Sequence, residues 1–514
     1  MIAVNDGVGK AVDRVQSIVI VGGGAAGWLA AASLGRLLSR SFYRILVIDS
    51  PLYASGAVSE AVLPSFHRLN HLLGINEQDL LKKTRGTYRL GARFADWGAV
   101  GGRYLHAFGS FGAKLEAVPF HHYWIKLHRM GEGLAFEDYS TAAAAAKQCR
   151  FAPPVSDRQS VLSTYSYGYH FHAASLAAYL KEYALAHGVL HSDRSIAEVQ
   201  LRGEDGFIDA LLTDDGARIC ADLYLDCTGA LGILAQQALK TGFEDWSRWL
   251  TCDRFVGISS ASAGDAPPYS DSLAERCGWR RRVPLQDCAD VGLAYSSRHV
   301  SDDEAAAKLL AGLAGAALGE PKLLSLPQGR PTRFWNKNCI ALTGSSAEPL
   351  EHTGLHLVQT GVMRLIALFP VGRFSAADME EYNRLTAMEH ERIRDFLILH
   401  YKCTQRSDSP FWEYCRNMQV PDTLRRKLEL FRSCGRVALL DEEHFTEDSW
   451  LAVLLGQNIH PMDYDPLADV LDVGAVKDAL SHMRSLISEG VASLPLHARY
   501  LERHCAVTPR TASE

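Results

Sequence analysis

Three glycines near the start of the chain have the spacing of a dinucleotide-binding turn. Gly22, Gly24 and Gly27 form a Gly-x-Gly-x-x-Gly pattern, with Ala25 and Ala26 between the last two. In such a turn the first glycine allows a tight bend, the second lets the backbone approach a pyrophosphate, and the third lets a helix pack on the strand. The phosphates then lie at the positive end of the helix, near its unpaired N–H groups. The pattern therefore predicts that this turn binds an anionic dinucleotide.

An acidic residue completes the motif 22 residues after Gly27. Asp49 ends an apolar run, and a carboxylate in that place accepts a hydrogen bond from a ribose 2′-hydroxyl and disfavours a 2′-phosphate. The β-branched run 18–21 before the glycines and the Ala- and Leu-rich stretch after them complete a βαβ unit. NAD and FAD both satisfy this pattern, and a glycine-rich turn without a ligand is the alternative.

Composition excludes several classes of protein. The chain has 514 residues, a size that predicts about three structural units. Its net charge is -6 and no long basic run offsets it, which argues against a nucleic-acid partner. No run of 18 apolar residues and no apolar leader occurs, so we expect a soluble, cytoplasmic protein with no membrane partner. Eleven cysteines without a Cys-x-x-Cys pair indicate reduced thiols and no metal site.

The hydrophobic periodicity predicts an α/β protein whose elements become helical toward the end. Leu223 begins a strand that ends in the small-residue turn at Asp226 and Gly229. We expect the backbone to come close to the cofactor again at this turn. We expect a strand over 88–97, loops and helices that build a substrate pocket in 98–160, and mostly helices from 380 onward. The predicted division is a tail at 1–16, a cofactor-binding α/β domain at 17–375 with an inserted substrate-side sheet, and a helical region at 376–514 that covers the substrate pocket.

Several blocks along the chain, taken together and in order, resemble the tryptophan-halogenase family of flavin-dependent enzymes. The resemblance covers residues 17 to about 500 and implies the doubly wound, Rossmann-like FAD-binding fold of the flavin monooxygenases. The Gly27-Trp28 junction is distinctive of the family. The matching blocks are 21–28, 60–65, 94–97, 226–229, 250–254, 278–286, 295–297, 333–339, 348–354, 394–401 and 449–457.

The resemblance also implies a reaction. In the family, a separate NAD(P)H-dependent flavin reductase supplies FADH2, which reacts with oxygen to give a flavin hydroperoxide. Chloride or bromide attacks this species to form hypohalous acid, which passes down a tunnel to a small, electron-rich aromatic substrate such as an indole or tryptophan. The separation keeps the substrate away from the peroxide and suppresses hydroxylation. A homodimer is one expected assembly.

The resemblance assigns roles to residues around position 351. Glu351 matches the catalytic glutamate that orients the oxidant or stabilises the arenium intermediate, and a carboxylate can also take the leaving proton. The alternative is a structural carboxylate that caps a helix. Thr353 and Gly354 match the residues whose backbone N–H groups bind the halide. His352 stands where the family usually has serine, on the substrate side, and Glu60 lies in the loop near the flavin.

The first departure from the family is at its catalytic lysine, which aligns with Arg89. The family's lysine is thought to hydrogen-bond hypohalous acid or to form a haloamine with it. Arginine keeps its proton at any working pH, so it can hold the acid by hydrogen bonds, while the haloamine route is largely closed. Lys82 and Lys83 are alternatives for this role.

The second departure is in the family's Trp-x-Trp-x-Ile-Pro signature, which walls the tunnel. Trp279 and Pro284 are kept, but the second tryptophan has become Arg281, which makes the passage more polar. The alternative is a solvated surface turn, most plausible for Arg280 and Arg282.

His106 and Phe108 lie among aromatic residues in the region that should line the substrate pocket, where they would contact a planar substrate. Ordinary core aromatics are the alternative. Three functions remain open. The first is an FADH2-dependent halogenase. The second is a flavin monooxygenase or oxidase on the same scaffold, favoured by Arg89 and Arg281. The third is a non-enzymatic flavin-binding or sensory protein.

Overall fold

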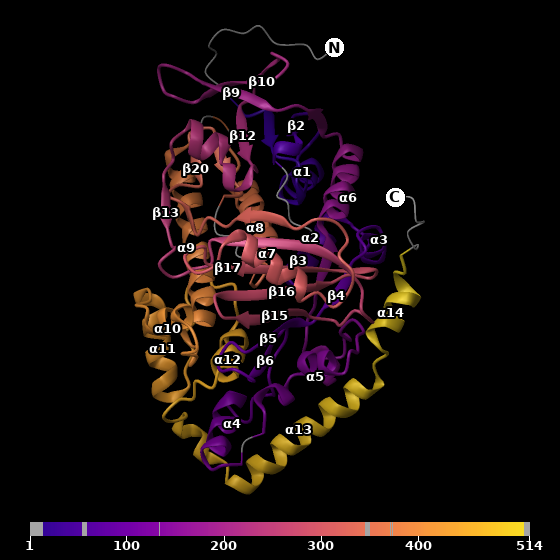
Figure 1. The fold of residues 1–514 in the computed structure, drawn as a ribbon, viewed down its shortest axis with the longest axis vertical. Helices are drawn as coiled ribbons and strands as arrows, with labels where there is room; N and C mark the ends of the chain where they lie inside the picture. The colour runs from indigo at the N-terminus through magenta and orange to yellow at the C-terminus, as the bar shows by residue number, and fades with distance from the viewer. Residues whose placement is uncertain are drawn as a thin grey trace.

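The structure is a computed structural model that describes residues 14–53, 59–132, 134–344, 350–370, 372 and 374–507. Most of the predicted tail lies outside the described residues. A six-stranded sheet forms one end of the molecule, at the top of Figure 1. In spatial order its strands are β20 (Trp335–Asn336), β21 (Cys339–Ala341), β12 (Leu223–Asp226), β1 (Ser17–Val21), β2 (Arg44–Asp49) and β8 (Leu190–Asp193).

The predicted βαβ unit forms the centre of this sheet. The strand β1 pairs in parallel with both β2 and β12, and the helix α1 (Ala25–Leu37) connects β1 to β2. Side chains alternate across the strand: Ile18 and Ile20 join the core beneath α1, while Val19 and Val21 join a second core. That second core is covered by a three-stranded sheet of β9 (Ile196–Leu201), β10 (Ile208–Thr213) and β11 (Arg218–Ile219).

A second, seven-stranded sheet crosses the middle of the molecule, as Figure 1 shows. It is mostly antiparallel, and its strands come from two distant parts of the chain. In spatial order they are β18 (Lys322–Ser325), β14 (Arg254–Ala261), β17 (Cys288–Tyr295), β16 (Gly278–Pro284), β15 (Ser270–Glu275), β5 (Gly91–Ala95) and β6 (Arg103–Ala107). This is the inserted sheet that the sequence predicts.

Two small sheets complete the β structure of the described residues. One contains β3 (Ser59–Val62), β7 (Gly168–His172) and β4 (Thr87–Arg89), and the other pairs β13 (Phe243–Asp245) with β19 (Gly329–Pro331). The three-stranded sheet of β3, β7 and β4 matters for function because it carries Glu60 and Arg89.

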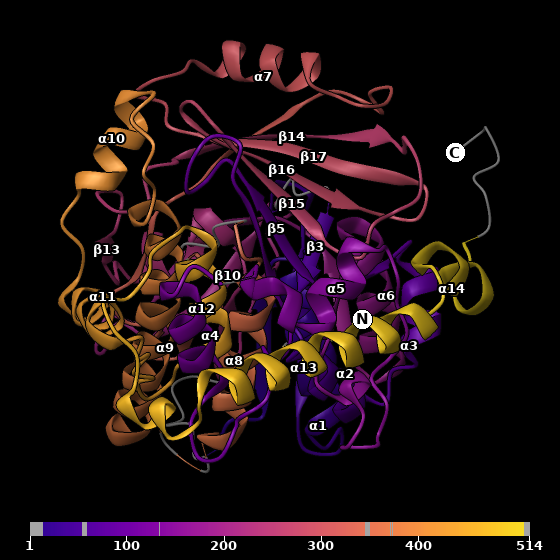
Figure 2. The same ribbon diagram turned by 90° about the horizontal axis from the view of Figure 1, so that it is seen from below.

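The described residues after 375 contain helices and no strand, and the long helix α9 begins at Ala376. The division at 375 itself stays a prediction. Figure 2 shows α13 crossing one end of the molecule and α7 lying outside the seven-stranded sheet. The remaining α-helices are α2 (Phe66–Leu73), α3 (Glu77–Lys83), α4 (Phe120–Arg129), α5 (Thr141–Lys147), α6 (Ala173–Ala186), α7 (Asp302–Ala311), α8 (Gly354–Ala367), α9 (Ala376–Lys402), α10 (Pro410–Asn417), α11 (Asp422–Cys434), α12 (Glu447–Gly456), α13 (Val473–Ser493) and α14 (His497–His504).

Two sequence-based expectations were wrong in detail. The run 88–97 was expected to be one strand, but it divides at Leu90 into β4 and β5, which belong to different sheets, because the N–H of Leu90 pairs with Pro268 instead. Residues 103–107 were expected to be loop or helix and form the strand β6. The run 279–284 lies in β16 of the large sheet, which rules out the alternative of a surface turn. In each case long-range strand pairing overrides the local pattern.

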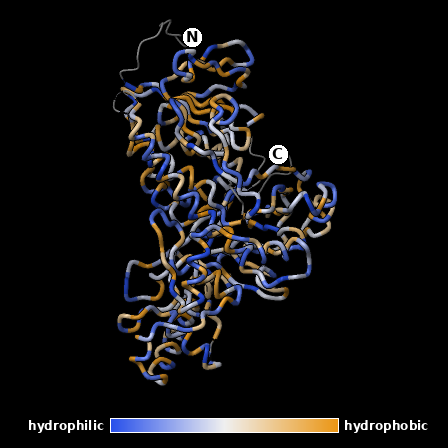
Figure 3. Tube along the Cα trace, turned by 90° about the vertical axis from the view of Figure 1, so that its left-hand side faces the viewer, coloured by the Kyte–Doolittle hydropathy of each residue, from blue (hydrophilic) through white to orange (hydrophobic). Residues whose placement is uncertain are grey.

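The fold class predicted from the sequence is confirmed: an α/β protein with a central parallel sheet, an inserted second sheet and a mostly helical end. Figure 3 shows apolar (orange) and hydrophilic (blue) positions interspersed along the whole length of the trace. The cysteines form no disulfide among the described residues. Among the described residues, no helix combines the length and the apolar character that crossing a membrane requires.

Candidate active site

The glycine turn has the shape of a phosphate cradle. A Cβ on Gly22, whose φ is +113°, would lie 2.3 Å from the carbonyl oxygen of Cys227, and a Cβ on Gly27 would lie 1.8 Å from the carbonyl oxygen of Gly22. Both glycines are therefore required by packing. Gly24 is different, because a Cβ there would meet no atom within 4 Å. It is the N-cap of α1, so the backbone at the helix N-terminus faces open space that fits a pyrophosphate.

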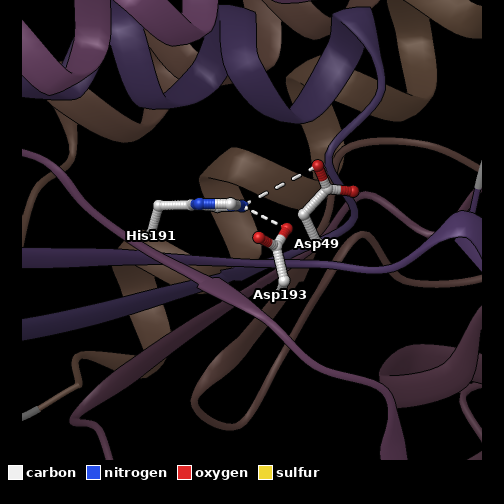
Figure 4. A group of neighbouring side chains, drawn as sticks. All are labelled: Asp49, His191 and Asp193. Carbon is white, nitrogen blue, oxygen red and sulfur yellow. Dashed lines mark ion pairs between the residues drawn. The ribbon is translucent and has the colours of Figure 1, made fainter.

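Asp49 lies directly beside this turn. A Cβ on Gly23 would lie 1.9 Å from the Asp49 carboxyl carbon, so the carboxylate packs under the glycines. Figure 4 shows Asp49 with His191 and Asp193: the His191 Nε2 atom lies 3.9 Å from one carboxylate and 3.0 Å from the other. The Nζ atom of Lys181 is 3.2 Å from the same ring nitrogen. A lysine so close disfavours a metal ion, so we interpret the group as an ionic cluster.

The carboxylate of Asp226 is used by the chain itself. One oxygen accepts hydrogen bonds from the N–H and hydroxyl of Thr228, and the other accepts from the N–H groups of Leu234 and Ala235 at 2.9 Å. Four acceptor sites are about what a carboxylate offers. Asp226 therefore shapes the turn that follows β12, in which Gly229 adopts a φ of +62°, instead of offering a free oxygen to a ligand.

Glu60 lies on β3 beside a buried ion pair that sequence reasoning missed. The Asp290 carboxylate, which has no solvent exposure, pairs with Arg281 and accepts a 2.5 Å hydrogen bond from the Ser59 hydroxyl. Arg281 thus joins β16 to β17 and, through Ser59, to β3. Burial raises the pKa of Glu60 to about 7, Arg281 lowers it and Asp290 raises it.

The raised pKa of Glu60 predicts a pH-dependent effect on stability. The carboxyl ionises less readily in the folded chain. Its contribution to the free energy of unfolding is therefore complete below its ordinary pKa and is lost as the pH rises through about 7. Glu60→Gln should therefore melt like the parent near pH 4.5 and melt higher, on the order of 2 °C, above pH 7.5. Glu304→Gln is the opposite control, since hydrogen bonds from Ser301 lower the pKa of Glu304. A melting difference for Glu60→Gln that does not change with pH would contradict the prediction.

Glu351 is fully buried at the meeting point of three elements. Its Oε1 atom accepts a 2.9 Å hydrogen bond from His106 Nδ1 on β6 and lies 3.2 Å from His400 Nε2 on α9. Its Oε2 atom has no hydrogen-bond partner among the described residues. Burial alone would raise the pKa of Glu351, but His106 and His400 outweigh it and hold the pKa well below its ordinary value. Glu351 is therefore a buried anion with one free oxygen.

Arg89 faces that free oxygen. Its NH2 atom lies 4.0 Å from Glu351 Oε2, and its side chain has no solvent exposure. The Nε atom donates to Ser270 at 3.0 Å, and the guanidinium carbon lies 4.9 Å from the centre of the Phe108 ring. Both terminal nitrogens lack hydrogen-bond partners in the described residues. Burial lowers the pKa of Arg89 to about 10, opposed by Glu351, so the side chain stays protonated near pH 7.

The next three residues lead from Glu351 into α8. His352 has a φ of +57°, an uncommon conformation for a residue other than glycine. Burial, Arg89 and Arg281 all lower its pKa, which keeps the ring neutral. Thr353 is the N-cap of α8 and Gly354 its first residue, so their backbone groups lie at the positive end of a 14-residue helix. The structure thus brings the predicted halide-binding residues next to Glu351.

The remaining predicted residues lie around this centre. Trp279 is fully buried and donates from its indole nitrogen to the Tyr401 hydroxyl at 2.9 Å, and the Pro284 carbonyl accepts from Thr87. His106 and Phe108 lie in contact on or just after β6, with ring centres 5.8 Å apart. The predicted lysine alternatives are elsewhere: Lys82 and Lys83 end α3, and Lys83 pairs with exposed acids.

Sequence reasoning assigned no role to His400, Tyr104 or Gln457, which the structure joins to Glu351. His400 had one signal, a histidine that ends the otherwise apolar run 396–399 inside a helix. Gln457 lies in the matching block 449–457, and Tyr104 lies among the aromatic residues of 98–160, but neither observation pointed to Glu351. Each is buried, and each comes from a different element.

Comparisons with known proteins identify the family of the chain. The family model described as tryptophan halogenase matches residues 17–473. A flavin-dependent halogenase from Xanthomonas campestris is 39% identical, with a TM-score of 0.93 and coverage of 97% of this chain and 100% of that one. The halogenase BrvH from Brevundimonas sp. BAL3 is also 39% identical, with a TM-score of 0.92 and coverage of 96% and 100%. Tryptophan 7-halogenase KtzQ from Kutzneria sp. (strain 744) is 28% identical over 96% of this chain and 98% of its own length. The chain belongs to the tryptophan halogenase family of flavin-dependent oxidoreductases.

Proposed function

We propose that the protein uses reduced FAD, oxygen and chloride or bromide to halogenate a small electron-rich aromatic compound such as an indole or tryptophan. The observation that carries the proposal is the buried Glu351 anion, whose free oxygen faces Arg89 and which directly precedes the N-terminus of α8. A separate NAD(P)H-dependent reductase would supply the flavin. Cytoplasmic location and a homodimer remain predictions.

The glycine turn and Asp49 would hold FAD. Gly24 offers open space at the helix N-terminus for the pyrophosphate, and Ala25 and Ala26 supply N–H groups there. Asp49 would accept a hydrogen bond from the adenosine ribose. When bound and reduced, FAD supplies the two electrons that, with oxygen and a halide, yield hypohalous acid. Asp226 would act indirectly, by shaping the turn at Gly229.

The residues around Glu351 would divide the remaining work. Backbone N–H groups of Thr353 and Gly354 would bind the halide. Arg89 would hold hypohalous acid by hydrogen bonds from its two unpartnered nitrogens. Glu351 would stabilise positive charge on the ring and accept, at Oε2, the proton that the halogen replaces. Trp279, Arg281, Pro284, His352 and Phe108 would line the passage, and Glu60 would lie at its flavin end.

One experiment separates halogenation from the second candidate, which Arg89 and Arg281 favour because they replace residues that handle hypohalous acid in the family. Purified protein is supplied with a reductase, NADH, FAD, oxygen, bromide and an indole or a phenol. A brominated product without hydroxylation supports the proposal. Hydroxylation that carries labelled oxygen from O2, or substrate oxidation that ignores bromide, would show a monooxygenase or oxidase instead.

A pair of glycine variants tests the cofactor site. Gly24→Ala should leave the apo-protein's melting temperature nearly unchanged, because its φ of -73° suits alanine and the Cβ meets nothing. It should weaken FAD binding by about tenfold or more, because the Cβ would occupy the pyrophosphate position. Gly27→Ala is the contrasting variant, with a clash inside the protein that should cost about 3 kcal/mol or more of stability. Unchanged FAD affinity in Gly24→Ala, measured by flavin fluorescence titration, would remove the turn from the cofactor site.

A further inference from the structure

A chain of buried polar groups leads away from Glu351 through His400. Tyr104 on β6 places its hydroxyl 3.0 Å from His400 Nδ1, and Gln457, just after α12, places its Nε2 atom 3.3 Å from that hydroxyl. The same Nε2 atom lies 3.0 Å from the His400 carbonyl oxygen. Gln457 and His400 have no solvent exposure and Tyr104 has 4%. None of the roles assigned to residues in the proposed reaction accounts for this series of hydrogen-bonded groups.

Counting donors and acceptors determines the direction of each hydrogen bond. The His400 carbonyl can only accept, so the group of Gln457 beside it must be the NH2, which then also donates to the Tyr104 oxygen. The Tyr104 hydroxyl hydrogen is left for His400 Nδ1. Nδ1 must therefore be the unprotonated nitrogen of the neutral ring, and Nε2, which faces Glu351, must carry the hydrogen.

Packing holds the ring in this orientation. Phe94 stacks on His400 with ring centres 4.6 Å apart and on Tyr104 at 5.0 Å. A Cβ on Gly456 would lie 2.5 Å from the Tyr104 ring, so α12 presses on that ring directly. Burial raises the pKa of Tyr104 well above its ordinary value, so the phenol keeps its hydrogen near neutral pH.

We propose that Tyr104 and Gln457 are positioning residues that hold His400 as its Nε2–H tautomer, so that an N–H and not a lone pair faces Glu351 Oε1. The other tautomer would place a lone pair 3.2 Å from a buried carboxylate oxygen. With the Nε2–H tautomer, His400 places an N–H 3.2 Å from Oε1, at an angle outside hydrogen-bond geometry, while His106 Nδ1 donates a hydrogen bond to the same oxygen. Oε2 is then the one oxygen of Glu351 left for the reaction.

The groups that surround His400 shift its pKa in opposite directions, and burial has the largest effect. Burial lowers the pKa of His400, Glu351 raises it and His106 lowers it. The hydrogen bond from Tyr104 stabilises the neutral ring and acts in the same direction as burial. The neutral ring keeps an N–H 3.2 Å from Glu351 Oε1, where it disfavours protonation of that oxygen. The consequence for rate rests on the proposed function, whereas the tautomer of His400 does not.

Nitrogen-15 NMR of histidine-labelled apo-protein tests the tautomer directly near pH 7.5, with His400→Gln used to assign the signal. We expect a protonated Nε2 and an unprotonated Nδ1 in the parent, and loss of this single tautomer in Tyr104→Phe. Tyr165→Phe is the matched control, because it removes another buried tyrosine hydrogen bond, to the Ala152 carbonyl at 2.6 Å. A protonated Nδ1 in the parent, or an unchanged tautomer in Tyr104→Phe, would overturn the proposal.

The parent measurement decides the question even if Tyr104→Phe fails to fold, and Gln457→Leu provides a second variant with the same expected direction. In turnover, Tyr104→Phe should lower kcat about tenfold with KM for the aromatic substrate and FAD affinity nearly unchanged, and Tyr165→Phe should not. If the parent shows the expected tautomer but makes no halogenated product, the proposed function fails and the positioning inference stands. If the tautomer is wrong in an active enzyme, the positioning inference fails alone.

Discussion

Glu351→Gln is expected to lower the rate of aromatic halogenation by about 10² to 10⁴ while FAD affinity stays within about twofold. Glutamine keeps the shape of the side chain but cannot stabilise a cationic ring or accept its proton. It also removes the anion toward which His106 donates at 2.9 Å and which Arg89 faces at 4.0 Å. The measurement is the initial rate of brominated product in the reductase-coupled reaction, together with an FAD titration.

The control for this variant is another buried carboxylate with similar partners. Glu389 is 4% exposed, lies 3.0 Å from His356 and 2.7 Å from Arg364, and has its pKa lowered to about 2 by those partners against the effect of burial. Glu389→Gln should reduce stability and leave the rate per folded enzyme nearly unchanged. A 1,3-dicarbonyl compound, which free hypohalous acid halogenates, shows which step is impaired. Glu351→Gln should still halogenate this trap, because the variant affects the aromatic substrate and not the formation of hypohalous acid. A parent-like halogenation rate in Glu351→Gln would remove the residue from the mechanism.

Arg89→Ala is expected to lower halogenation about 100-fold or more, whereas Arg89→Lys should retain or raise it. Alanine removes the buried cation that faces Glu351 Oε2, and loss of one partner of a buried pair typically costs about 3 to 5 kcal/mol of stability. Lysine restores a cation and brings back a side chain that can lose its proton, which reopens the haloamine route. Rates of product formation and melting temperatures of both variants provide the measurement.

Arg394 offers a matched control for Arg89. It is 7% exposed, its guanidinium pairs with Asp395 at 2.8 Å and it lies against two tryptophans, away from Glu351. Arg394→Ala should lower the melting temperature without the selective loss of halogenation. If Arg89→Ala and the parent halogenate at equal rates per folded enzyme, Arg89 does not hold the oxidant, and Lys82 and Lys83 become the next variants to test.

The predictions that depended on local chemistry were largely correct. Positive φ at Gly22, the close contact at Gly27 and the strand end at Asp49 follow from residues within one βαβ unit, so the motif itself specifies them. The division of 88–97 between two sheets was missed because Leu90 pairs with Pro268, far away in the sequence. The cofactor roles of these residues stay predictions that the glycine variants test.

The residues that surround Glu351 could not be predicted from the local sequence. His106 and Glu351 are 245 residues apart, Tyr104 and His400 are 296 apart, and Gln457 and Tyr104 are 353 apart. A family motif identified Glu351, but no spacing in the chain reveals which histidines donate to it. Arg281 was a departure in the sequence, and only folding showed its partner Asp290 on the adjacent strand.

The sequence by itself determined the glycine turn, the acid that follows it, the family and the identity of the replaced residues. These are short-range features, because a few neighbouring residues specify a turn or a motif, and their order in the sequence is enough to identify it. The tertiary structure alone decided that Arg89 faces the free oxygen of Glu351 and that Tyr104, Gln457 and His400 support the other oxygen. Those contacts form only when two sheets and a helical region pack together, since burial and donor geometry belong to the assembled core and to no single segment.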